Sequence, residues 1–211
     1  MVTNLILIRH AETSCNHTGQ YQGQIDNELS TIGKNQAKAL AKSFYFDAIN
    51  NKNYIDAIYS SDLKRAQKTA TYISKQLCIP INLMKNLREI SFGLWEGLTF
   101  DEIYNKWPKE AAQFIETPAL VKIPQGESVI ELQQRAMLAL DKICKNHINQ
   151  TVIIVTHGGF IKTVIAKILH MPLSSMWNLE IGNTSITKIK YFHEIKCCQL
   201  TLLNDLHHLK T

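Results

Sequence analysis

The chain has 211 residues, of which 45% are hydrophobic and 19% are charged, and its formal net charge is +5. These values are typical of a single globular domain and exclude a disordered or fibrous protein. The basic residues are scattered rather than gathered in a stripe, which disfavours nucleic-acid binding and favours a small anionic partner.

The five cysteines form an odd set without the spacing of a metal site, and we expect them to be reduced thiols. No apolar run approaches the roughly 18 residues that a membrane span needs. No secretory segment precedes the cysteines. The sequence therefore predicts a cytoplasmic protein without a membrane partner.

The first strand is predicted at residues 5–8, an apolar run that ends at Arg9 and His10. Ligands gather at the carboxyl ends of strands in α/β sheets, so both side chains stand at a candidate site. Taken alone, such a pair is more often a surface arginine and a hydrogen-bonded core histidine. A polar loop at residues 17–28 follows, with Gln22 and Gly23 near its middle.

A helix is predicted from Ser30, which can cap it. Its buried face is expected to include Ile32, Leu40, Ala41 and Phe44, which recur at helical spacing.

A second strand is predicted at residues 54–60, and Ser61 with Asp62 is expected to cap the next helix. Arg65 falls in the first turn of that helix. A cation is disfavoured at this end of the helix dipole unless an anion is bound nearby. Arg65 is therefore either a phosphate ligand or a solvent-facing arginine.

A short strand at residues 79–83 precedes a loop at residues 87–98 that carries Glu89, which can be functional or simply solvated. Thr99 and Glu102 form a capping box for a further helix, which Pro108 is expected to stop. We expect an irregular segment from there to Pro124, as part of a cap over the site.

Ser128 and Glu131 form a second capping box, which opens a helix to about Asn146. Residues 151–156 are continuous and β-branched, as in a central parallel strand. His157 and two glycines then lead into a helix at residues 160–170. Such a turn presents free backbone N–H groups to a phosphate.

The last part of the chain is predicted to form two strands, at residues 184–192 and 199–203, separated by a short turn. His207 and His208 are expected at the surface.

Two of the four arginines and two histidines thus stand at strand ends or in a first helical turn. Guanidinium groups bind phosphate oxygens bidentately and stay charged, so Arg9 and Arg65 can hold one phosphoryl group. His10 is then a candidate nucleophile, with His157 as its electrostatic partner. A metal-dependent hydrolase is disfavoured, because the eight histidines lack paired ligand spacing and no acidic cluster accompanies them.

Six motifs occur along the chain in this order: RHAETSCN, YQGQIDNELSTIG, SSDLKRAQKTA, LREISFGLWEGLT, PQGES and VTHGGFIK. Together they cover nearly the whole chain, which resembles the histidine phosphatase superfamily in the branch shared with cofactor-dependent phosphoglycerate mutases. The resemblance implies a three-layer α/β/α sandwich with a mostly parallel central sheet. It also implies a single domain over residues 1–211, with an inserted cap at about residues 90–127.

The resemblance also implies roles for individual residues. His10 would take the phosphoryl group as a phosphohistidine, Glu89 would be the proton donor, and Arg9, Arg65 and His157 would surround the transferring oxygens. Further substrate-binding residues are expected at Asn16, Gln22, Gly23 and Gly158. No metal and no other cofactor is expected.

Ala11 stands where the family usually has glycine. Alanine restricts positive φ, so the backbone beside His10 is expected to adopt an ordinary conformation. We expect a modest effect on fit rather than a loss of activity.

The motifs are compatible with three functions: a phosphatase, a phosphoglycerate mutase and a non-catalytic phosphate-binding protein. A mutase must hold a second anionic group, whereas residues 90–126 contain aromatic side chains and no arginine. The loop FGLWEGLT also resembles the phosphatase branch, including α-ribazole phosphatases and broad-specificity phosphatases. The sequence thus favours a metal-independent phosphomonoesterase acting on a small phosphorylated metabolite. The individual substrate and the oligomeric state stay open.

Overall fold

A six-stranded sheet forms the middle layer of the structure, a computed structural model that describes residues 1–51 and 54–210. The strands are β1 (Val2–Arg9), β2 (Ala57–Ser60), β3 (Ile81–Leu83), β4 (Thr151–Thr156), β5 (Ile186–Phe192) and β6 (Cys197–Asp205). Their order is β3-β2-β4-β1-β5-β6. The first four strands are parallel, whereas β5 and β6 pair antiparallel to their neighbours. The predicted α/β class with a mostly parallel sheet is confirmed.

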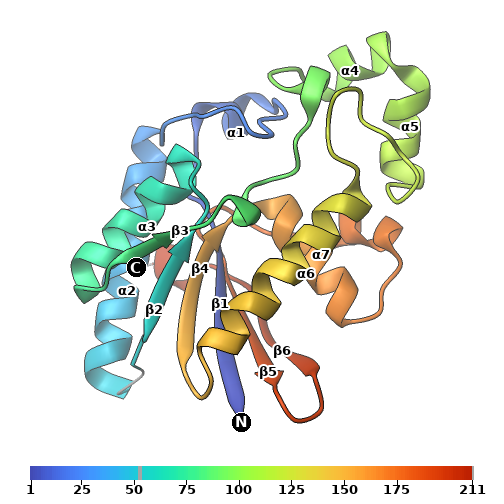
Figure 1. Cartoon of the computed structure of the whole chain (residues 1–211). Helices are drawn as coiled ribbons and strands as arrows, with labels where there is room; N and C mark the ends of the chain where they lie inside the picture. Colours follow the sequence, from blue (N-terminus) through green and yellow to red (C-terminus); the bar gives the residue numbers. More distant parts are fainter. Residues whose placement is uncertain (52–53, 211) are drawn as a thin grey trace.

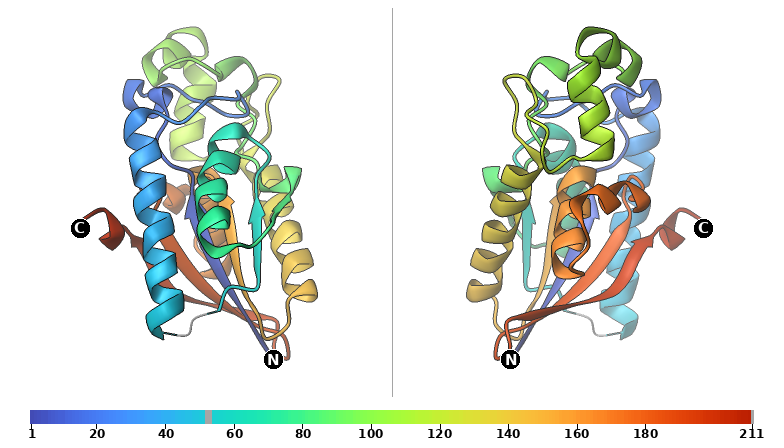
Figure 2. Two further views of the ribbon diagram at one scale, coloured as in Figure 1. Left: turned by 90° about the vertical axis from the view of Figure 1, so that its left-hand side faces the viewer. Right: turned by 90° about the vertical axis from the view of Figure 1, so that its right-hand side faces the viewer.

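Helices cover both faces of the sheet (Figure 1). α2 (Thr31–Asn51) and α3 (Lys64–Leu77) lie on one face, and α6 (Val129–Asn146) and α7 (Gly158–Ile168) lie on the other, as the side views in Figure 2 show. Successive side chains of a strand point to opposite faces. Accordingly, Ile6 and Ile8 of β1 pack in the cluster with α2 and α3, whereas Leu5 and Leu7 pack in the cluster with α6 and α7.

The neighbouring strands β1 and β4 end in register. β4 lies between β2 and β1 and is parallel to both, as predicted for a central strand. Arg9 pairs with Thr156, and the amide of His10 donates to the Thr156 carbonyl at 2.9 Å. His10 and His157, about 147 residues apart in the chain, therefore leave the sheet side by side at its carboxyl edge.

Shorter elements complete the structure: α1 (Ser14–Thr18), α4 (Phe100–Lys106), α5 (Pro108–Glu116), η1 (Lys85–Leu87), η2 (Gly93–Trp95), η3 (Leu173–Asn178) and η4 (His207–Leu209). Helices α4 and α5 lie beyond the carboxyl edge of the parallel strands (Figure 1). The two predicted capping boxes, one opening α4 and the other opening α6, are both present.

The expectation of an irregular segment up to Pro124 is wrong for residues 108–116, which form α5, and is confirmed for residues 117–124, which contain neither helix nor strand. Helix α4 ends at Lys106 as predicted, but Pro108 is the first residue of α5. Proline suits this position because its fixed φ is helical and the first N–H of a helix has no intrahelical partner. Phe114 of α5 is buried, with its ring centroid 4.9 Å from that of Trp177. This contact packs α5 against η3.

Two burial expectations are also wrong. Ile32, predicted on the buried face of α2, is 58% exposed, whereas the other three residues predicted on that face are buried. His208, predicted at the surface, is only 6% exposed. Its Nε2 atom lies 3.1 Å from Thr184 Oγ1, so a tertiary contact buries it.

Gly33 allows the start of α2 to touch the loop that follows His10. A Cβ atom at this position would lie 2.0 Å from the backbone oxygen of Glu12. The same oxygen accepts from the amide of Ser30 at 3.0 Å, and the Ser30 hydroxyl accepts from the Gly33 amide at 2.9 Å, which confirms the predicted cap. The helix start thus holds Glu12 directly against its backbone.

The substitution Gly33→Ala is predicted to destabilise the protein and lower turnover. Alanine gains about 1 kcal/mol in helix propensity, but overpacking typically costs about 1–3 kcal/mol, and here the contact is with backbone that cannot rotate away. Thermal unfolding and kcat measure the two effects. The exposed change Lys38→Ala on the same helix is the control, and equal melting temperatures for the two variants would contradict the steric account.

Candidate active site

Two buried histidines stand at the carboxyl edge of the sheet. His10 follows β1 and His157 follows β4, and their ring centroids are 5.2 Å apart. His10 is 3% exposed and His157 is fully buried. The sheet register therefore brings together the two histidines that the sequence singled out.

Hydrogen bonding fixes the tautomer of His10. Its Nδ1 atom lies 2.8 Å from the carbonyl oxygen of Ala11, which can only accept, so Nδ1 carries the proton. Burial and the nearby Arg65 and Arg9 hold the pKa of His10 well below its ordinary value. The imidazole is therefore neutral at physiological pH, and its Nε2 atom carries a lone pair.

Ala11 adopts an ordinary backbone, as predicted, since it is not among the non-glycine residues with positive φ. Its methyl group is buried in a small cluster with Leu29 and Ala37. Its amide donates to Thr69 Oγ1 at 3.0 Å. The alanine thus packs away from the imidazole and helps to hold the carbonyl that orients it.

Arg65 places a buried guanidinium beside His10. The side chain is 1% exposed and donates to the carbonyls of Gly23, at 2.6 Å, and Ile25, at 2.7 Å. Burial lowers its pKa to about 10, so it stays charged at neutral pH. Its buried Nε–H has no partner in the described residues. Arg65 thus keeps a donor for a ligand.

Arg9 offers a second guanidinium with the same property. Its Nη1 atom donates to the carbonyl of Ile181 at 2.6 Å, while its buried Nε–H lacks a partner within residues 1–51 and 54–210. Gly158 lies against it, since a Cβ added there would be 3.5 Å from Arg9 Nε. Arg9 and Arg65 consequently each have a buried Nε–H group without a partner in the described residues.

Glu89 lies at the N-terminus of α7, where it is held by backbone amides. Its carboxylate accepts from the amides of Ile90 at 3.0 Å, Gly159 at 3.0 Å and Phe160 at 3.2 Å. A Cβ at position 159 would lie 2.5 Å from Oε1, so glycine is needed for this approach. The prediction that this turn offers free amides to phosphate is therefore wrong for residues 159 and 160, whose amides are occupied by Glu89.

Asn16 and Gln22 both use their amide oxygens within the protein. Asn16 Oδ1 accepts from the Thr13 amide at 3.0 Å, and Gln22 Oε1 accepts from the Thr13 hydroxyl at 2.9 Å and from Asn27 Nδ2 at 3.3 Å. These bonds leave the side-chain NH2 groups of both residues as donors. Gly23 has φ +50°, and its carbonyl accepts a hydrogen bond from Arg65.

A cavity of about 310 Å³ is bounded by most of the predicted site residues, but the fully buried His157 is not among its lining residues. Its lining includes Arg9, His10, Asn16, Gln22, Gly23, Arg65 and Glu89. We call it the phosphoryl cavity. Gly158 instead lines an adjoining cavity of about 600 Å³, which we call the outer cavity. The two share Arg9, Tyr21, Glu89, Phe92 and Trp177 in their walls.

Two residues that sequence reasoning did not assign to the site support its histidines. Ser61 was expected to cap α3, but the N-cap residue is Leu63, and Ser61 Oγ instead lies 2.9 Å from His157 Nε2. Asn183 donates through Nδ2 to the carbonyl of His10 at 3.0 Å. Ser61 belongs to the motif SSDLKRA, whereas the sequence around Asn183 carried no signal.

Within the described part of the chain, no group of three or more His, Cys, Asp or Glu side chains has an arrangement that could hold a metal ion. The same residues include no helix with the length and hydropathy of a membrane span.

The two buried imidazoles predict a pH-dependent stability. Burial and nearby arginines lower the pKa of His10 and of His157 below 6.5 in the folded protein. The unfolded chain therefore takes up protons first as pH falls, and the stability that is present above about pH 6.5 is lost below it. In phosphate-free buffer, the melting temperature should fall from pH 7.5 to pH 5.0, and it should fall less in the double variant His10→Gln, His157→Gln.

The exposed change His17→Gln is the control and should keep the full pH dependence. An equal fall in the double variant and the wild type would show that carboxylates, not these imidazoles, produce the effect.

Comparison with known proteins identifies relatives along nearly the whole chain. Residues 5–205 match the model of the histidine phosphatase superfamily (branch 1). A metal-independent phosphoserine phosphatase of Arabidopsis thaliana is 37% identical over 79% of this chain and 69% of the relative. A phosphoglycerate mutase-like protein of the same plant is 31% identical over 98% of this chain and 86% of the relative.

A solved structure shares the fold and the chain length. It is a histidine-to-alanine variant of phosphoserine phosphatase from Entamoeba histolytica, in complex with phosphoserine. The TM-score is 0.86 at 34% identity, covering 98% of this chain and 99% of that one. Family, fold and enzyme class agree with the expectations from the sequence. The chain belongs to the histidine phosphatase superfamily (branch 1), as a phosphatase-type enzyme.

Proposed function

We propose that the enzyme hydrolyses small phosphomonoesters through a phosphohistidine formed on Nε2 of His10. The observation that supports this most strongly is the hydrogen bond from His10 Nδ1–H to the Ala11 carbonyl, which leaves Nε2 as the nucleophile. Arg9 and Arg65, whose Nε–H groups have no partner in the described residues, both line the phosphoryl cavity.

In the first step, His10 Nε2 forms a bond to phosphorus while the bond from phosphorus to the leaving alcohol breaks. Glu89 gives a proton to the leaving oxygen. In the second step, Glu89 takes a proton from water as the water attacks phosphorus, and the P–N bond breaks to release phosphate and neutral His10. Glu89 lines both cavities, a position that suits a group acting on the oxygen between phosphoryl group and alcohol.

The two guanidinium groups neutralise the phosphoryl oxygens during both steps. Both stay in place because backbone carbonyls hold them, so they need no reorganisation in the transition state. Loss of one such preorganised donor typically lowers kcat about 10²- to 10³-fold. The Asn16 and Gln22 amides add neutral donors.

The contact with Ser61 favours the tautomer of His157 that carries its proton on Nδ1. The amide of Leu63 donates to Ser61 Oγ at 3.3 Å, so the Ser61 hydroxyl proton is free to go to His157 Nε2. The neutral ring then carries its proton on Nδ1, which is buried and has no partner in the described chain. His157 thereby donates to a phosphoryl oxygen without becoming charged.

Phosphoserine is the first substrate to test, since it is the compound named for the relatives from Arabidopsis thaliana and Entamoeba histolytica. A mutase would need to bind a second phosphate group. In the outer cavity, Lys162 is the only cation besides Arg9 among the described lining residues, which favours hydrolysis.

The mechanism predicts that His10→Ala lowers hydrolysis of p-nitrophenyl phosphate at least 10³-fold and that EDTA leaves wild-type activity unchanged. In Glu89→Gln, aryl phosphates with poor leaving groups should slow most, because they need the proton most. Undiminished turnover in His10→Ala, or equal slowing across the leaving-group series in Glu89→Gln, would refute the assigned roles. His17→Ala is the control for His10.

We expect Ser61→Ala to lower kcat about 10²-fold, because it removes one preorganised donor to the phosphoryl group. Ser61→Thr should restore part of the lost kcat. The readout specific to this role is the ¹⁵N NMR signature of His157, which should change from the Nδ1–H tautomer to a mixture in Ser61→Ala. Ser43→Ala removes a half-buried hydroxyl of α2, which donates to the Leu40 carbonyl at 2.8 Å, and should change neither quantity. An unchanged His157 tautomer in Ser61→Ala would contradict the argument.

A further inference from the structure

The outer cavity is the place where the leaving alcohol must lie. It joins the phosphoryl cavity at Arg9 and Glu89, and its walls combine aromatic rings with a few polar groups. Four charged side chains line it: Arg9, Glu89, Lys162 and Glu180. The proposed reaction uses Arg9 and Glu89, so one cation and one anion have no role in the chemistry.

Lys162 lies in α7, in the turn that follows the Glu89-binding amides. Its side chain is half-buried, and Nζ lies 5.5 Å from the centroid of the Trp177 ring. Within the described residues it has no hydrogen bond to a carboxylate and no ion pair within 4.0 Å. Burial and Arg9 lower its pKa, while Glu89 and Glu180 oppose that effect. The ammonium is therefore held at the cavity wall without an anionic partner.

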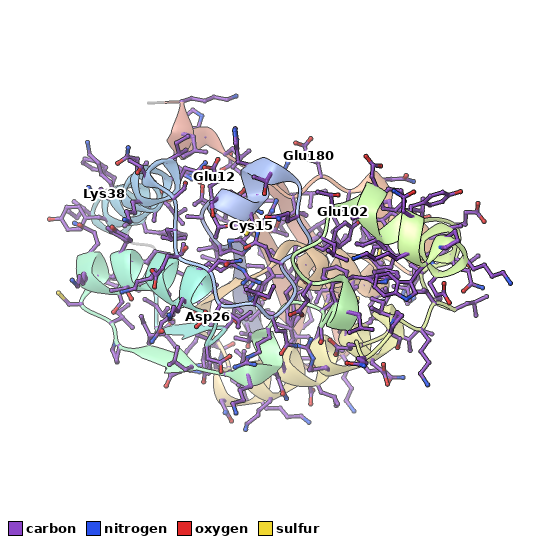
Figure 3. The ribbon with its side chains drawn as sticks, turned by 90° about the horizontal axis from the view of Figure 1, so that it is seen from above. Glu12, Cys15, Asp26, Lys38, Glu102 and Glu180 are labelled. Carbon is purple, nitrogen blue, oxygen red and sulfur yellow. The ribbon has the colours of Figure 1, made fainter. Side chains whose placement is uncertain are left out.

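Glu180 lies in the segment between η3 and β5. Seen from above, it stands between α1 and the cap (Figure 3). Its carboxylate is exposed and makes no ion pair with the described residues, although it acts electrostatically on Lys162. The outer cavity thus presents separated positive and negative groups to the leaving alcohol.

We propose that Lys162 binds a carboxylate and Glu180 binds an ammonium of the leaving alcohol, so that the outer cavity selects O-phosphorylated amino acids. This inference rests on the proposed function, because it places the leaving alcohol beside Glu89. A zwitterion can pair with both side chains. A sugar leaves both charges unpaired, and the Glu180 carboxylate repels a second phosphate group. A site built for paired groups rejects ligands that lack them.

Four substrates test the two proposed contacts separately, that of Lys162 with a carboxylate and that of Glu180 with an ammonium. O-phosphoserine carries both groups, O-phosphoethanolamine lacks the carboxylate, 3-phosphoglycerate lacks the ammonium, and p-nitrophenyl phosphate lacks both. Lys162→Met keeps the apolar length that packs on Trp177 but removes the charge. The variant should lower kcat/KM about 10- to 100-fold for phosphoserine and 3-phosphoglycerate, the two substrates that carry a carboxylate. The change should lie mainly in KM, as expected for loss of a charged hydrogen bond. For phosphoethanolamine and p-nitrophenyl phosphate, kcat/KM should change less than about twofold.

Glu180→Gln should show the complementary pattern. We expect kcat/KM to fall for phosphoserine and phosphoethanolamine, and to rise for 3-phosphoglycerate because a repulsive carboxylate is removed. Lys167→Met, an exposed lysine on the same helix that does not line the cavity, is the matched control and should change none of the four values.

Equal changes across all four substrates in Lys162→Met, or no change in any, would overturn the assignment. Wild-type enzyme that hydrolyses p-nitrophenyl phosphate but shows no preference for phosphoserine over phosphoethanolamine would also overturn it, while leaving the proposed function intact. Failure to hydrolyse any of the four substrates would instead count against the proposed function itself.

Discussion

The buried guanidinium of Arg65 and the half-buried guanidinium of Arg9 lie beside a neutral imidazole, and both donate to backbone carbonyls rather than to a paired carboxylate. Arg65 is held by the carbonyls of Gly23 and Ile25, and Arg9 by that of Ile181. The nearby carboxylate of Glu89 is itself bound by three amides. Buried charges without close partners are costly, so the site has an excess of positive charge that a phosphoryl dianion would offset. The same charge suppresses protonation of His10 and keeps its lone pair available.

The fold supplies this arrangement through the register of two strands. β1 and β4 end at the same level, so Arg9, His10 and His157 leave the sheet together. Helix α7 then turns its first amides to Glu89 rather than to the ligand. A helix N-terminus that could bind phosphate directly is thereby used to place a carboxylate between the phosphoryl cavity and the outer cavity. In the proposed mechanism, proton transfer and phosphoryl transfer consequently take place at neighbouring positions on this edge of the sheet.

Local sequence patterns predict many of the strands, helix starts and site residues. Apolar runs located the strands, two capping boxes located helix starts, and the motifs singled out Arg9, His10 and Arg65. Contacts between distant residues were not predictable in the same way. Ser61 looked like a helix cap, but its hydroxyl bonds to His157, which lies 96 residues later. The burial of His208 and the occupation of the Gly159 amide by Glu89 likewise depend on partners that no local pattern reveals.

The central claim is that His10 attacks phosphorus through Nε2, because its Nδ1–H is bound to the Ala11 carbonyl. The most direct measurement mixes the enzyme with p-nitrophenyl phosphate, quenches within one turnover in alkali and locates the phosphoryl group by peptide mass spectrometry and ¹H–³¹P NMR. The account predicts a single phosphohistidine, on His10, with phosphorus bonded to Nε2. Phosphorus on Nδ1, on another residue, or absent during a burst of nitrophenol would contradict it.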